Sequence, residues 1–599
     1  MLALAFSIVP MTAMPSASGV GIASAGSAVR FALTDEPGWW FKSSAGPIGG
    51  THSLAVVRPG DRVSFTGKSA TVHTVTSLIF PAGAAGMPFD TKAMKGSAEV
   101  TLRTPGLYVF TCKIHPYMFA AVVVDDRATP GLDLGERITL LNGVTIPTSS
   151  DLATRLLRTF FIATDPSNWL DYTAPGPWHV TYPDVTVRIS GGAVVNLRQV
   201  LNARYGNDLA RPAFQRPATP GVGEVWVNTQ FERTSGKRKP GTATAVDAGT
   251  WSVRRKVALP GIEMNNAHNM WTDRGQTVIY TTQWFDSKLT VFDRRTGALI
   301  DNISVGEAPA HVMTRIDTDQ VHVTLNGEDS AESVVELSPL ARSVERKIDL
   351  GRPFPHAHWM SHDGHTMVTP NAFTADSTVY DFGTHGAVAQ VPTGMHPIAT
   401  GMMPDASKYY VANLIDSTIT VIDTRSGAVL KTIDLLEHYD PLSGTISGPA
   451  GGLPIQTPVG PNGKYMVTAN TLTGTILVID TTTDTVVTML PCDPGCHGVQ
   501  FGAKQGGGYY AYVASKFSNA LLVVDPDPDG DGNGADAAVV GRVSLVATSR
   551  TAVDDTVSGN RGMGGQGVLP IPVVYNGWVQ RLPAEWKALL TPAQRSPIQ

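Results

Sequence analysis

The segments KLTVFDRRTGALI (288–300), STITVIDTRSGAVL (417–430) and GTILVIDTTTDTVV (474–487) repeat one pattern: a β-rich run, a turn at an aspartate, and a second β-rich run. Weaker copies occur at 333–348 and 377–391. The turn residues recur at intervals of 42 to 57 residues and are Asp293, Ser338, Asp381, Asp423, Asp480 and Asp525. Four-stranded propeller blades have this period. The repeats predict a β-propeller with seven blades, which begin near residues 223, 266, 309, 354, 396, 454 and 496.

The composition agrees with a mainly β protein and excludes some partners. The 599-residue chain contains 60 Gly and 42 Pro, which favour short strands joined by tight turns. The formal net charge is −5 and only 16% of the residues are charged, so the chain has no basic field to attract nucleic acid or anionic lipid. We expect no nucleic-acid partner. We also expect no membrane span, because no segment after the N-terminus is long and apolar enough to cross a bilayer.

The N-terminal residues resemble a targeting segment. They are apolar and then rich in small residues, with AxA-like stretches near residues 23–28, but they lack the usual Lys/Arg-rich start. We interpret residues 1–29 as a secretory signal or a disordered leader. Export predicts a periplasmic or secreted protein, in a compartment where thiol pairs can oxidise.

The chain ahead of the repeats has a different character. Residues 30–125 contain apolar runs bounded by Gly, Pro or Asp, as in a small β-sandwich. A connecting segment, 126–222, is expected to hold a helix at Ser150–Ala163 and otherwise irregular, Pro-rich sequence. The propeller is assigned to 223–550 and a C-terminal extension to 551–599. The expected fold class is mainly β, with an N-terminal sandwich and a C-terminal seven-bladed propeller.

The stretch TCKIHPYM (111–118) contains a candidate metal site. It sets Cys112, His115 and Met118 in a C-x-x-H-x-x-M arrangement. A blue copper centre uses two imidazole nitrogens and a thiolate in one plane, with a distant thioether on the axis. His73, in the β-rich run ATVHTVTS, could supply the second imidazole. We favour a type 1 copper site over a buried cysteine with incidental neighbours, and the single cysteine indicates one copper ion.

A second group of histidines recurs at one place in the repeat, just ahead of the innermost strand of a blade. Its members are His268, His311, His356, His358, His396 and His497. Such positions converge around one mouth of the central channel. One histidine there would more often be a satisfied polar residue, but recurrence in five blades favours a metal cluster. Imidazoles suit copper, zinc or iron, and the neighbouring blue-copper site favours copper. We predict a multicopper centre in which these six residues are ligands and catalytic residues.

An acidic loop near the end of the repeats is a weaker candidate. The run DPDPDGDGNGAD (525–536) spaces its oxygen side chains as in an EF-hand-like calcium loop, and they are Asp525, Asp527, Asp529, Asn533 and Asp536. Two prolines and the missing flanking helices weaken the match. Structural calcium and a solvated acidic turn both stay open.

The two remaining cysteines precede a cluster histidine. Cys492, Cys496 and His497 form C-x-x-x-C-H, which is one residue longer than the haem-attachment motif C-x-x-C-H. We therefore expect a disulfide that braces the loop presenting His497.

The motifs carry resemblances to known families. The C-x-x-H-x-x-M loop with His73 resembles cupredoxins of the plastocyanin/amicyanin kind, and residues 222–550 resemble YVTN/YncE-type seven-bladed propellers. The combination is similar to nitrous oxide reductase and to the thiocyanate dehydrogenases, which carry three coppers on such a propeller. The reductase has a C-terminal binuclear cupredoxin and a paired HH in its first blade, where this chain has VWVNTQFE (225–232). This chain differs from the reductase at both points, so the resemblance implies the dehydrogenase-like branch, in which the substrate is oxidised.

Together these features give a functional hypothesis. The protein would be an exported copper-dependent oxidoreductase that oxidises a small inorganic sulfur or nitrogen compound, such as thiocyanate, and passes electrons through the type 1 copper to an external electron-transfer partner. A copper-bound hydroxide would attack the substrate, with Glu263, Asp273 or Glu307 as weak candidates for the proton acceptor. The alternatives are reduction of a small nitrogen oxide, or a non-enzymatic copper-binding or electron-transfer protein. A head-to-tail homodimer could join the two copper sites if they lay far apart in one chain.

Overall fold

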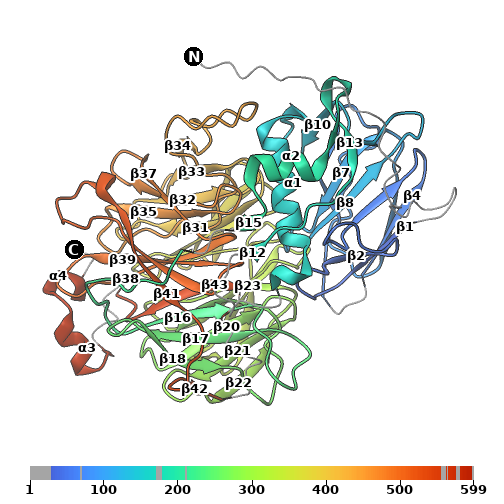
Figure 1. The fold of residues 1–599 in the computed structure, drawn as a ribbon. Coiled ribbons are helices and arrows are strands. Elements are labelled where there is room, and N and C mark those ends of the chain that lie inside the picture. Colours follow the sequence, from blue (N-terminus) through green and yellow to red (C-terminus); the bar gives the residue numbers. More distant parts are fainter. Residues whose placement is uncertain are drawn as a thin grey trace.

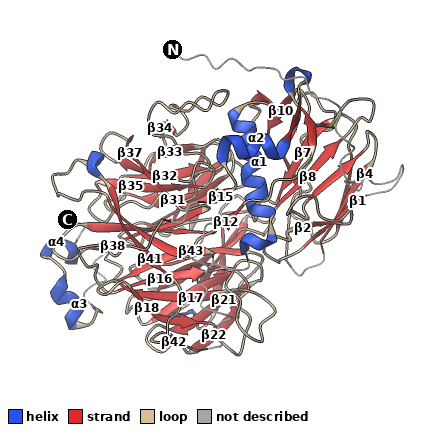
Figure 2. Cartoon of the chain, viewed as in Figure 1, coloured by secondary structure: helices blue, strands red, loops and turns tan. Residues whose placement is uncertain are grey.

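The computed structural model describes residues 29–67, 71–169, 178–209, 212–554, 562, 564–574 and 581–596. The leader expected at residues 1–29 lies outside these ranges apart from Val29, where β1 begins. A smaller unit, blue in Figure 1, lies beside a larger body of sheets coloured green to red. Strands dominate both parts (Figure 2), so the mainly β fold class is confirmed.

The smaller unit is a β-sandwich. One sheet has the order β2 (Phe41–Ser43), β1 (Val29–Leu33), β4 (Arg62–Gly67), β6 (Ser97–Thr101). The other has the order β11 (Thr145–Pro147), β10 (Arg137–Leu140), β5 (Thr76–Pro81), β7 (Gly106–Thr111), β8 (Phe119–Val124), β3 (Leu54–Val57). Phe65 of β4 meets Phe110 of β7 edge-on, with ring centroids 5.2 Å apart, and joins the two sheets. Strands β10 and β11 lie beyond residue 125, the boundary expected from the sequence.

The connecting segment is more ordered than its sequence indicated. Helix α1 (Asp151–Thr164) starts and ends within one residue of its prediction, and the Ser150 side chain caps it by accepting a hydrogen bond from the Ala153 N–H at 3.3 Å. The expectation of irregular chain elsewhere was wrong, because α2 (Leu197–Tyr205) follows. Only Leu197 and Leu201 of α2 are buried, so its apolar periodicity was too weak to predict a helix.

Short strands accompany these helices. They are β9 (Leu132–Asp133), β12 (Trp178–His179), β13 (Thr186–Arg188), β14 (Val194–Asn196) and β15 (Asp208–Leu209). Short 3₁₀ turns cover Pro166–Trp169, Ser190–Gly192, Pro339–Ala341 and Gly534–Asp536, and the chain ends with α3 (Ala584–Leu589) and α4 (Pro592–Arg595). No helix in the described ranges is long and apolar enough to cross a membrane; α1, at 14 residues, is the longest of them.

The larger unit is a seven-bladed β-propeller whose blades from the second to the seventh follow one another along the chain. The second blade contains β19 (Ala267–Thr272), β20 (Val278–Gln283), β21 (Lys288–Asp293) and β22 (Leu299–Ser304); the third, β23 (Pro309–Thr314), β24 (Val321–Leu325), β25 (Glu332–Leu337) and β26 (Val344–Asp349); the fourth, β27 (Trp359–Met360), β28 (Thr366–Asn371), β29 (Asp376–Asp381) and β30 (Gly386–Pro392). The fifth contains β31 (Pro397–Met402), β32 (Lys408–Asn413), β33 (Thr418–Asp423) and β34 (Val429–Asp434); the sixth, β35 (Tyr465–Asn470), β36 (Thr475–Asp480) and β37 (Thr485–Pro491); the seventh, β38 (Cys496–Ala503), β39 (Tyr509–Ser515), β40 (Ala520–Asp525) and β41 (Ala538–Ser544).

The repeated aspartates have one structural task. Each ends a strand, and in four of them the carboxylate accepts a hydrogen bond from the backbone N–H three residues later: Asp293, Asp381, Asp423 and Asp480. This bond measures 2.7 Å from Thr296 to Asp293 and 2.7 Å from Ser426 to Asp423. The side chain thereby fixes the tight turn into the outermost strand.

The first blade is completed by the end of the chain. Its sheet has the order β42 (Ala552–Val553), β18 (Ser252–Val257), β17 (Thr242–Asp247), β16 (Glu224–Thr229), β43 (Gly565–Ile571). Strand β43 pairs antiparallel with β16 and also contacts β19 and β38, the innermost strands of the second and seventh blades. The ring therefore closes through a strand located past residue 550, where the sequence analysis placed a C-terminal extension.

The two units are held together by polar contacts and a shared apolar core. Thr71 donates a hydrogen bond to the Phe285 carbonyl at 2.8 Å, and the Lys239 ammonium lies 2.8 Å from the Asp35 carboxylate. Aromatic residues from both units pack in one buried cluster around Trp40. This contact covers the C-x-x-H-x-x-M loop with the turn between β20 and β21.

Candidate metal centres

The sandwich brings three of the four predicted copper ligands together, and the fourth, Met118, is buried in the same loop. His73 precedes β5, whereas Cys112, His115 and Met118 lie in the loop between β7 and β8, and all four are buried. The Cys112 Sγ lies 3.6 Å from the His115 Nδ1 and 4.0 Å from the His73 Nδ1. One ligand atom from each of these three residues fits within 4.8 Å of the others. Both imidazoles thus present the same nitrogen to the thiol, which suits one copper ion among three ligands.

Neighbouring groups favour the ligand form of the cysteine. Backbone N–H groups of Thr74 and His115 donate to the Cys112 Sγ at 3.3 Å and 3.4 Å. Burial raises the pKa of Cys112, but hydrogen bonds from His115 and His73 outweigh burial and hold this pKa well below its usual range. The thiolate is the form that binds a metal.

A buried carboxylate stands behind His73. The His73 Nε2 lies 3.5 Å from Asp35, which also accepts a hydrogen bond from Thr71 at 3.1 Å. Burial lowers the pKa of His73, but Asp35 and Cys112 outweigh burial and raise it to about 9. Metal-binding histidines commonly direct their second nitrogen at such a carboxylate, which fixes the orientation of the ring.

Four of the six predicted propeller histidines gather at one mouth of the channel. The ring of His356 has its centroid 5.3 Å from that of His268 and 5.2 Å from that of His311. His268 lies 5.6 Å from His311 and 6.5 Å from His497. The residues His268, His311, His356 and His497 are called the imidazole cluster below. They come from the starts of β19, β23 and β38 and from the residues just ahead of β27.

Backbone carbonyls orient two of these rings. The His268 Nδ1–H donates to the Ala310 carbonyl at 2.9 Å, and the His356 Nδ1–H donates to the Ile398 carbonyl at 2.6 Å. Each carbonyl belongs to the following blade. This arrangement leaves Nε2 of each ring as the nitrogen that can bind a metal.

Several cluster nitrogens are buried without a hydrogen-bond partner among the described residues. They are Nε2 of His268, Nε2 of His311 and Nδ1 of His497. Burial lowers the pKa of His356 to about 4, and it lowers the pKa values of His268, His311 and His497 well below the usual range. The rings are therefore neutral at pH 7, and buried nitrogen lone pairs of this kind fit a copper ion.

The cluster is more open than the sandwich site. Among the described residues, no three of the propeller histidines have ligand nitrogens within 4.8 Å of one another. Its geometry suits several metal ions that each have few protein ligands, and it does not form one compact three-histidine site.

The other two predicted ligands lie to either side of the cluster. His358 lines the central channel together with His311, and both of its ring nitrogens are buried without a partner in the described chain. His396 donates from Nδ1 to the Ala372 carbonyl at 3.1 Å and lies 6.2 Å from the Phe373 ring. Burial lowers the pKa of His396 to about 3, and the Lys113 ammonium adds to this effect. His396 and Lys113 line one cavity, so His396 lies toward the sandwich ligand loop.

The channel below the cluster is narrow. Residues from all seven blades surround a cavity of about 30 Å³, and its wall includes His311 and His358. One ordered water needs roughly 10–15 Å³ of such space, so only very small molecules fit.

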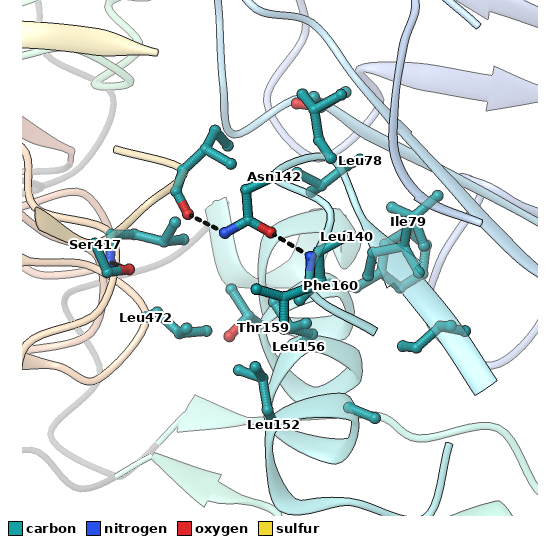
Figure 3. A pocket seen from close by; sticks show the side chains of 18 of the residues that line it. Leu78, Ile79, Leu140, Asn142, Leu152, Leu156, Thr159, Phe160, Ser417 and Leu472 are labelled. Carbon is teal, nitrogen blue, oxygen red and sulfur yellow. Dashed lines mark hydrogen bonds between the residues drawn. The ribbon is translucent and has the colours of Figure 1, made fainter. Parts of the chain in front are cut away.

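A larger cavity lies between the sandwich, α1 and the fifth and sixth blades (Figure 3). Its volume is about 380 Å³, and its walls are mainly apolar side chains such as Leu140, Leu156 and Phe160. Figure 3 shows Asn142 bridging it, with its amide donating to the Ile415 carbonyl at 3.4 Å. The cavity is formed where three distant segments meet, so the sequence held no signal of it.

Two aromatic residues that the sequence did not single out lie between the two candidate metal sites. Trp284 and Phe285 occupy the turn from β20 to β21. The His115 ring stacks on Phe285 at 3.9 Å and meets Trp284 at 4.7 Å. On its other side, Trp284 lies 4.0 Å from His268 and 5.6 Å from His356. The only sequence signal was the WF pair in TTQWFDSK, and it did not stand out, because the equivalent turns of other blades also hold a large apolar residue, such as Phe373, Ile415 and Phe517.

A buried lysine was also missed. Lys516 donates to Gln230 at 2.9 Å and to Gln566, and its Nζ lies 4.1 Å from the centroid of the Tyr117 ring. The Gln566 amide in turn faces the His497 Nε2 at 3.2 Å. Burial lowers the pKa of Lys516 well below the usual range. The run ASKFSN gave no reason to single it out.

The carboxylates suggested as proton acceptors have structural partners instead. Glu263 accepts the backbone N–H of Lys239 at 2.9 Å, and Glu307 pairs with Lys95 at 2.5 Å. Asp273 accepts backbone N–H groups of its own turn, at 2.6 Å from Thr277. The described contacts therefore assign these three side chains to turns and to the interface, not to the imidazole cluster.

The acidic loop between β40 and β41 gathers a different set of oxygens from the one expected. Asp527 and Asp529 group with Asp531, which the EF-hand spacing did not include as a side-chain ligand. Asp525 pairs with Lys504 at 2.7 Å. Asn533 caps the following 3₁₀ turn, so its oxygen is already used, and Asp536 is exposed. The expected five-residue ligand set is not assembled in this structure.

The disulfide expected between Cys492 and Cys496 is confirmed. Cys496 begins β38, and His497 is its next residue. The bond therefore braces the loop that leads to the imidazole cluster.

Comparisons with known proteins add little to this geometry. No protein-family model and no curated protein sequence matches the chain. Similar solved structures include hydrazine synthase of Kuenenia stuttgartiensis, with 17% identity, a TM-score of 0.41 and coverage of 52% of this chain and 98% of that chain. A functionally unknown protein from Desulfotomaculum acetoxidans DSM 771 has 13% identity and a TM-score of 0.39 over 58% of this chain and 98% of its own. A Bacteroides uniformis ATCC 8492 protein, provisionally assigned as a 6-phosphogluconolactonase, has 16% identity and a TM-score of 0.41 over 58% and 99%. Similarity at this level says nothing about activity, so function rests on the sites themselves.

Proposed function

We propose that this protein is an exported copper-dependent oxidoreductase. It oxidises a small inorganic sulfur or nitrogen compound, with thiocyanate as the leading candidate, at the imidazole cluster. Electrons then pass through the type 1 site to an external electron-transfer partner. The observation that carries the proposal is the pairing of a buried His–Cys–His group that could hold a metal ion with a cluster of neutral, buried imidazoles only one side chain away.

The residues of both sites fit copper. The sandwich offers two Nδ1 atoms and a thiolate, with Met118 buried in the same loop. The propeller offers imidazole nitrogens without thiolates, two of them oriented by carbonyls. When bound, copper supplies one-electron redox chemistry at the first site, and at the second it also acidifies bound water.

The protein's own residues select and orient the substrate. The narrow channel beside His311 and His358 admits molecules little larger than water. The backbone carbonyls of Ala310 and Ile398 hold two cluster rings so that neither can rotate away from a bound ion. Burial keeps water away from the type 1 ligands, which favours electron transfer over ligand exchange.

Metal content tests the proposal first. Fully loaded protein should hold more than one copper per chain beyond the one that gives the blue absorption of a type 1 site. The double variant His268→Ala/His311→Ala should lose the additional copper and keep the blue absorption. Cys112→Ser is the matched control and should lose the blue absorption while keeping the cluster copper. One copper per chain in fully loaded wild-type protein would contradict the enzyme proposal.

A substrate screen then tests the reaction. Loaded protein is assayed with thiocyanate and other small sulfur and nitrogen anions in the presence of an artificial one-electron acceptor. Substrate-dependent reduction of the acceptor is expected, and both the double variant and Cys112→Ser should lose it. Turnover only with an electron donor and a nitrogen oxide would instead support reduction.

A further inference from the structure

We propose that Trp284 is the bridge through which electrons pass between the imidazole cluster and the type 1 site, so that the two centres work within one chain. The proposal rests on the proposed function, because it needs a redox metal at each site. It names the residue that carries the electrons, and it places both sites of the reaction in one chain.

The indole lies between one ring from each site. Its centroid is 4.7 Å from His115 of the sandwich and 4.0 Å from His268 of the propeller. The His115 and His268 rings can therefore be no farther apart than the sum of these two distances. His356, a second member of the cluster, is 5.6 Å from the same indole.

The turn that carries Trp284 is fixed to both units. The carbonyl of the next residue, Phe285, accepts hydrogen bonds from Thr71 of the sandwich at 2.8 Å and from Asn265 of the propeller at 2.6 Å. Phe285 also stacks on His115 with an interplanar angle of 21°. These contacts keep the indole in place on both sides, and only 1% of it is exposed.

The propeller also closes the sandwich site on this side. His115 is 0% exposed, because Phe285 and Trp284 cover its ring. An external protein cannot contact His115 directly, whereas only the Trp284 indole separates His115 from the imidazole cluster. This geometry needs no second subunit to connect the two centres.

His268, His311, His356 and His497 would hold copper on the propeller side, and His73, Cys112 and His115 would hold it on the sandwich side. With both sites filled, one electron would pass from the first ion, which would be oxidised, to the second, which would be reduced. No bond would form or break and no proton would move, and an external one-electron acceptor would take the electron from the sandwich site.

The test measures the transfer itself and needs no substrate. Copper-loaded protein with both sites oxidised receives a pulse of reducing radicals, and the blue absorption is followed as electrons equilibrate between the sites. The variants are Trp284→Leu, which removes the ring, and Trp284→Phe, which keeps a smaller one. Trp226→Leu is the control, because Trp226 is equally buried but packs on Phe292, away from both sites.

In Trp284→Leu, the concentration-independent rate should fall by about tenfold or more, with both copper sites still filled. The rate in Trp284→Phe should lie between those of Trp284→Leu and wild type, and Trp226→Leu should keep the wild-type rate. An unchanged rate in Trp284→Leu with both sites loaded would overturn the bridge and leave the proposed function intact. If Trp284→Leu does not fold, an unchanged rate in Trp284→Phe would count against the bridge. Wild-type protein that takes up only the type 1 copper would overturn both proposals.

Discussion

At the scale of single residues, the sandwich site depends on a carboxylate that binds no metal itself. Asp35 lies 3.5 Å from the His73 Nε2 and is held by Lys239 at 2.8 Å and Thr71 at 3.1 Å. Burial opposes its ionisation, but His73 and Lys239 lower the pKa of Asp35 to about 2. A permanent negative charge therefore stands behind His73, and in the proposed copper site it would favour the more positive, oxidised state of the metal.

The variant Asp35→Asn should weaken the site without removing a ligand. Copper affinity of the sandwich site is expected to fall about 10- to 100-fold, as for other residues that orient metal ligands. The reduction potential should rise, because the oxidised ion loses a nearby negative charge. Copper titration and a redox titration of the blue absorption measure both effects. Glu99→Gln, which removes a surface carboxylate paired with Arg62 on the same sandwich, is the control. An unchanged potential in Asp35→Asn would contradict the role given to this carboxylate.

At the scale of elements, turns between strands join neighbouring blades, and one of them carries an unfavourable charge. Asp319, in the turn from β23 to β24, accepts the backbone N–H of Arg274 from the second blade at 2.8 Å. Burial raises the pKa of Asp319 to about 6, and the nearby Asp273 adds to this effect. The folded state therefore binds a proton more tightly than the unfolded chain. Stability falls as the pH rises from about 4 through about 6, and the loss is complete at pH 7.

The variant Asp319→Asn should remove this pH-dependent loss of stability. Asn keeps an oxygen for the Arg274 N–H and tolerates the positive φ of 62° at this position. At pH 7 the free energy of unfolding should rise by up to about 1 kcal/mol, a value reduced because the side chain is partly exposed to solvent. The gain should vanish near pH 4, which denaturant titrations at the two pH values would show. Asp317→Asn, in the same turn but paired with Arg315, should give no gain. A variant no more stable than wild type at pH 7 would refute the account.

The elements that could be predicted from sequence were those with local signals. The aspartate turns recur because four of the carboxylates make the same local hydrogen bond, and α1 has both a cap and an apolar face. The five expected calcium ligands do not come together for a non-local reason, since Lys504 of another turn pairs with Asp525. The sequence did not point to Trp284, because only the packing of the sandwich on the propeller shows which turn faces His115.

At the scale of the whole molecule, strand β43 closes the propeller, and no pattern in its sequence predicts this role. Strand β43 contains Pro570 and lies at the opposite end of the propeller sequence from its partner β16. Residues 565–571 are all buried, and β43 forms the channel wall between β19 and β38. Ring closure is a property of the complete fold, so neither a repeat period nor a local pattern could reveal it.

A chain that ends at residue 562 should therefore lose the closed ring, whereas one that ends at Val574 should keep it. Burial of Val568, Leu569 and Ile571 stabilises the fold by about 2 kcal/mol for each side chain, and removing β43 also leaves the β16 edge without its partner. The shorter chain should unfold at a markedly lower temperature and with less cooperativity, and limited proteolysis should cleave its propeller. It also lacks Gln566, which contacts His497, so its imidazole cluster should bind copper more weakly than that of the longer chain. Equal unfolding temperatures for the two chains would show that the ring holds without its closing strand.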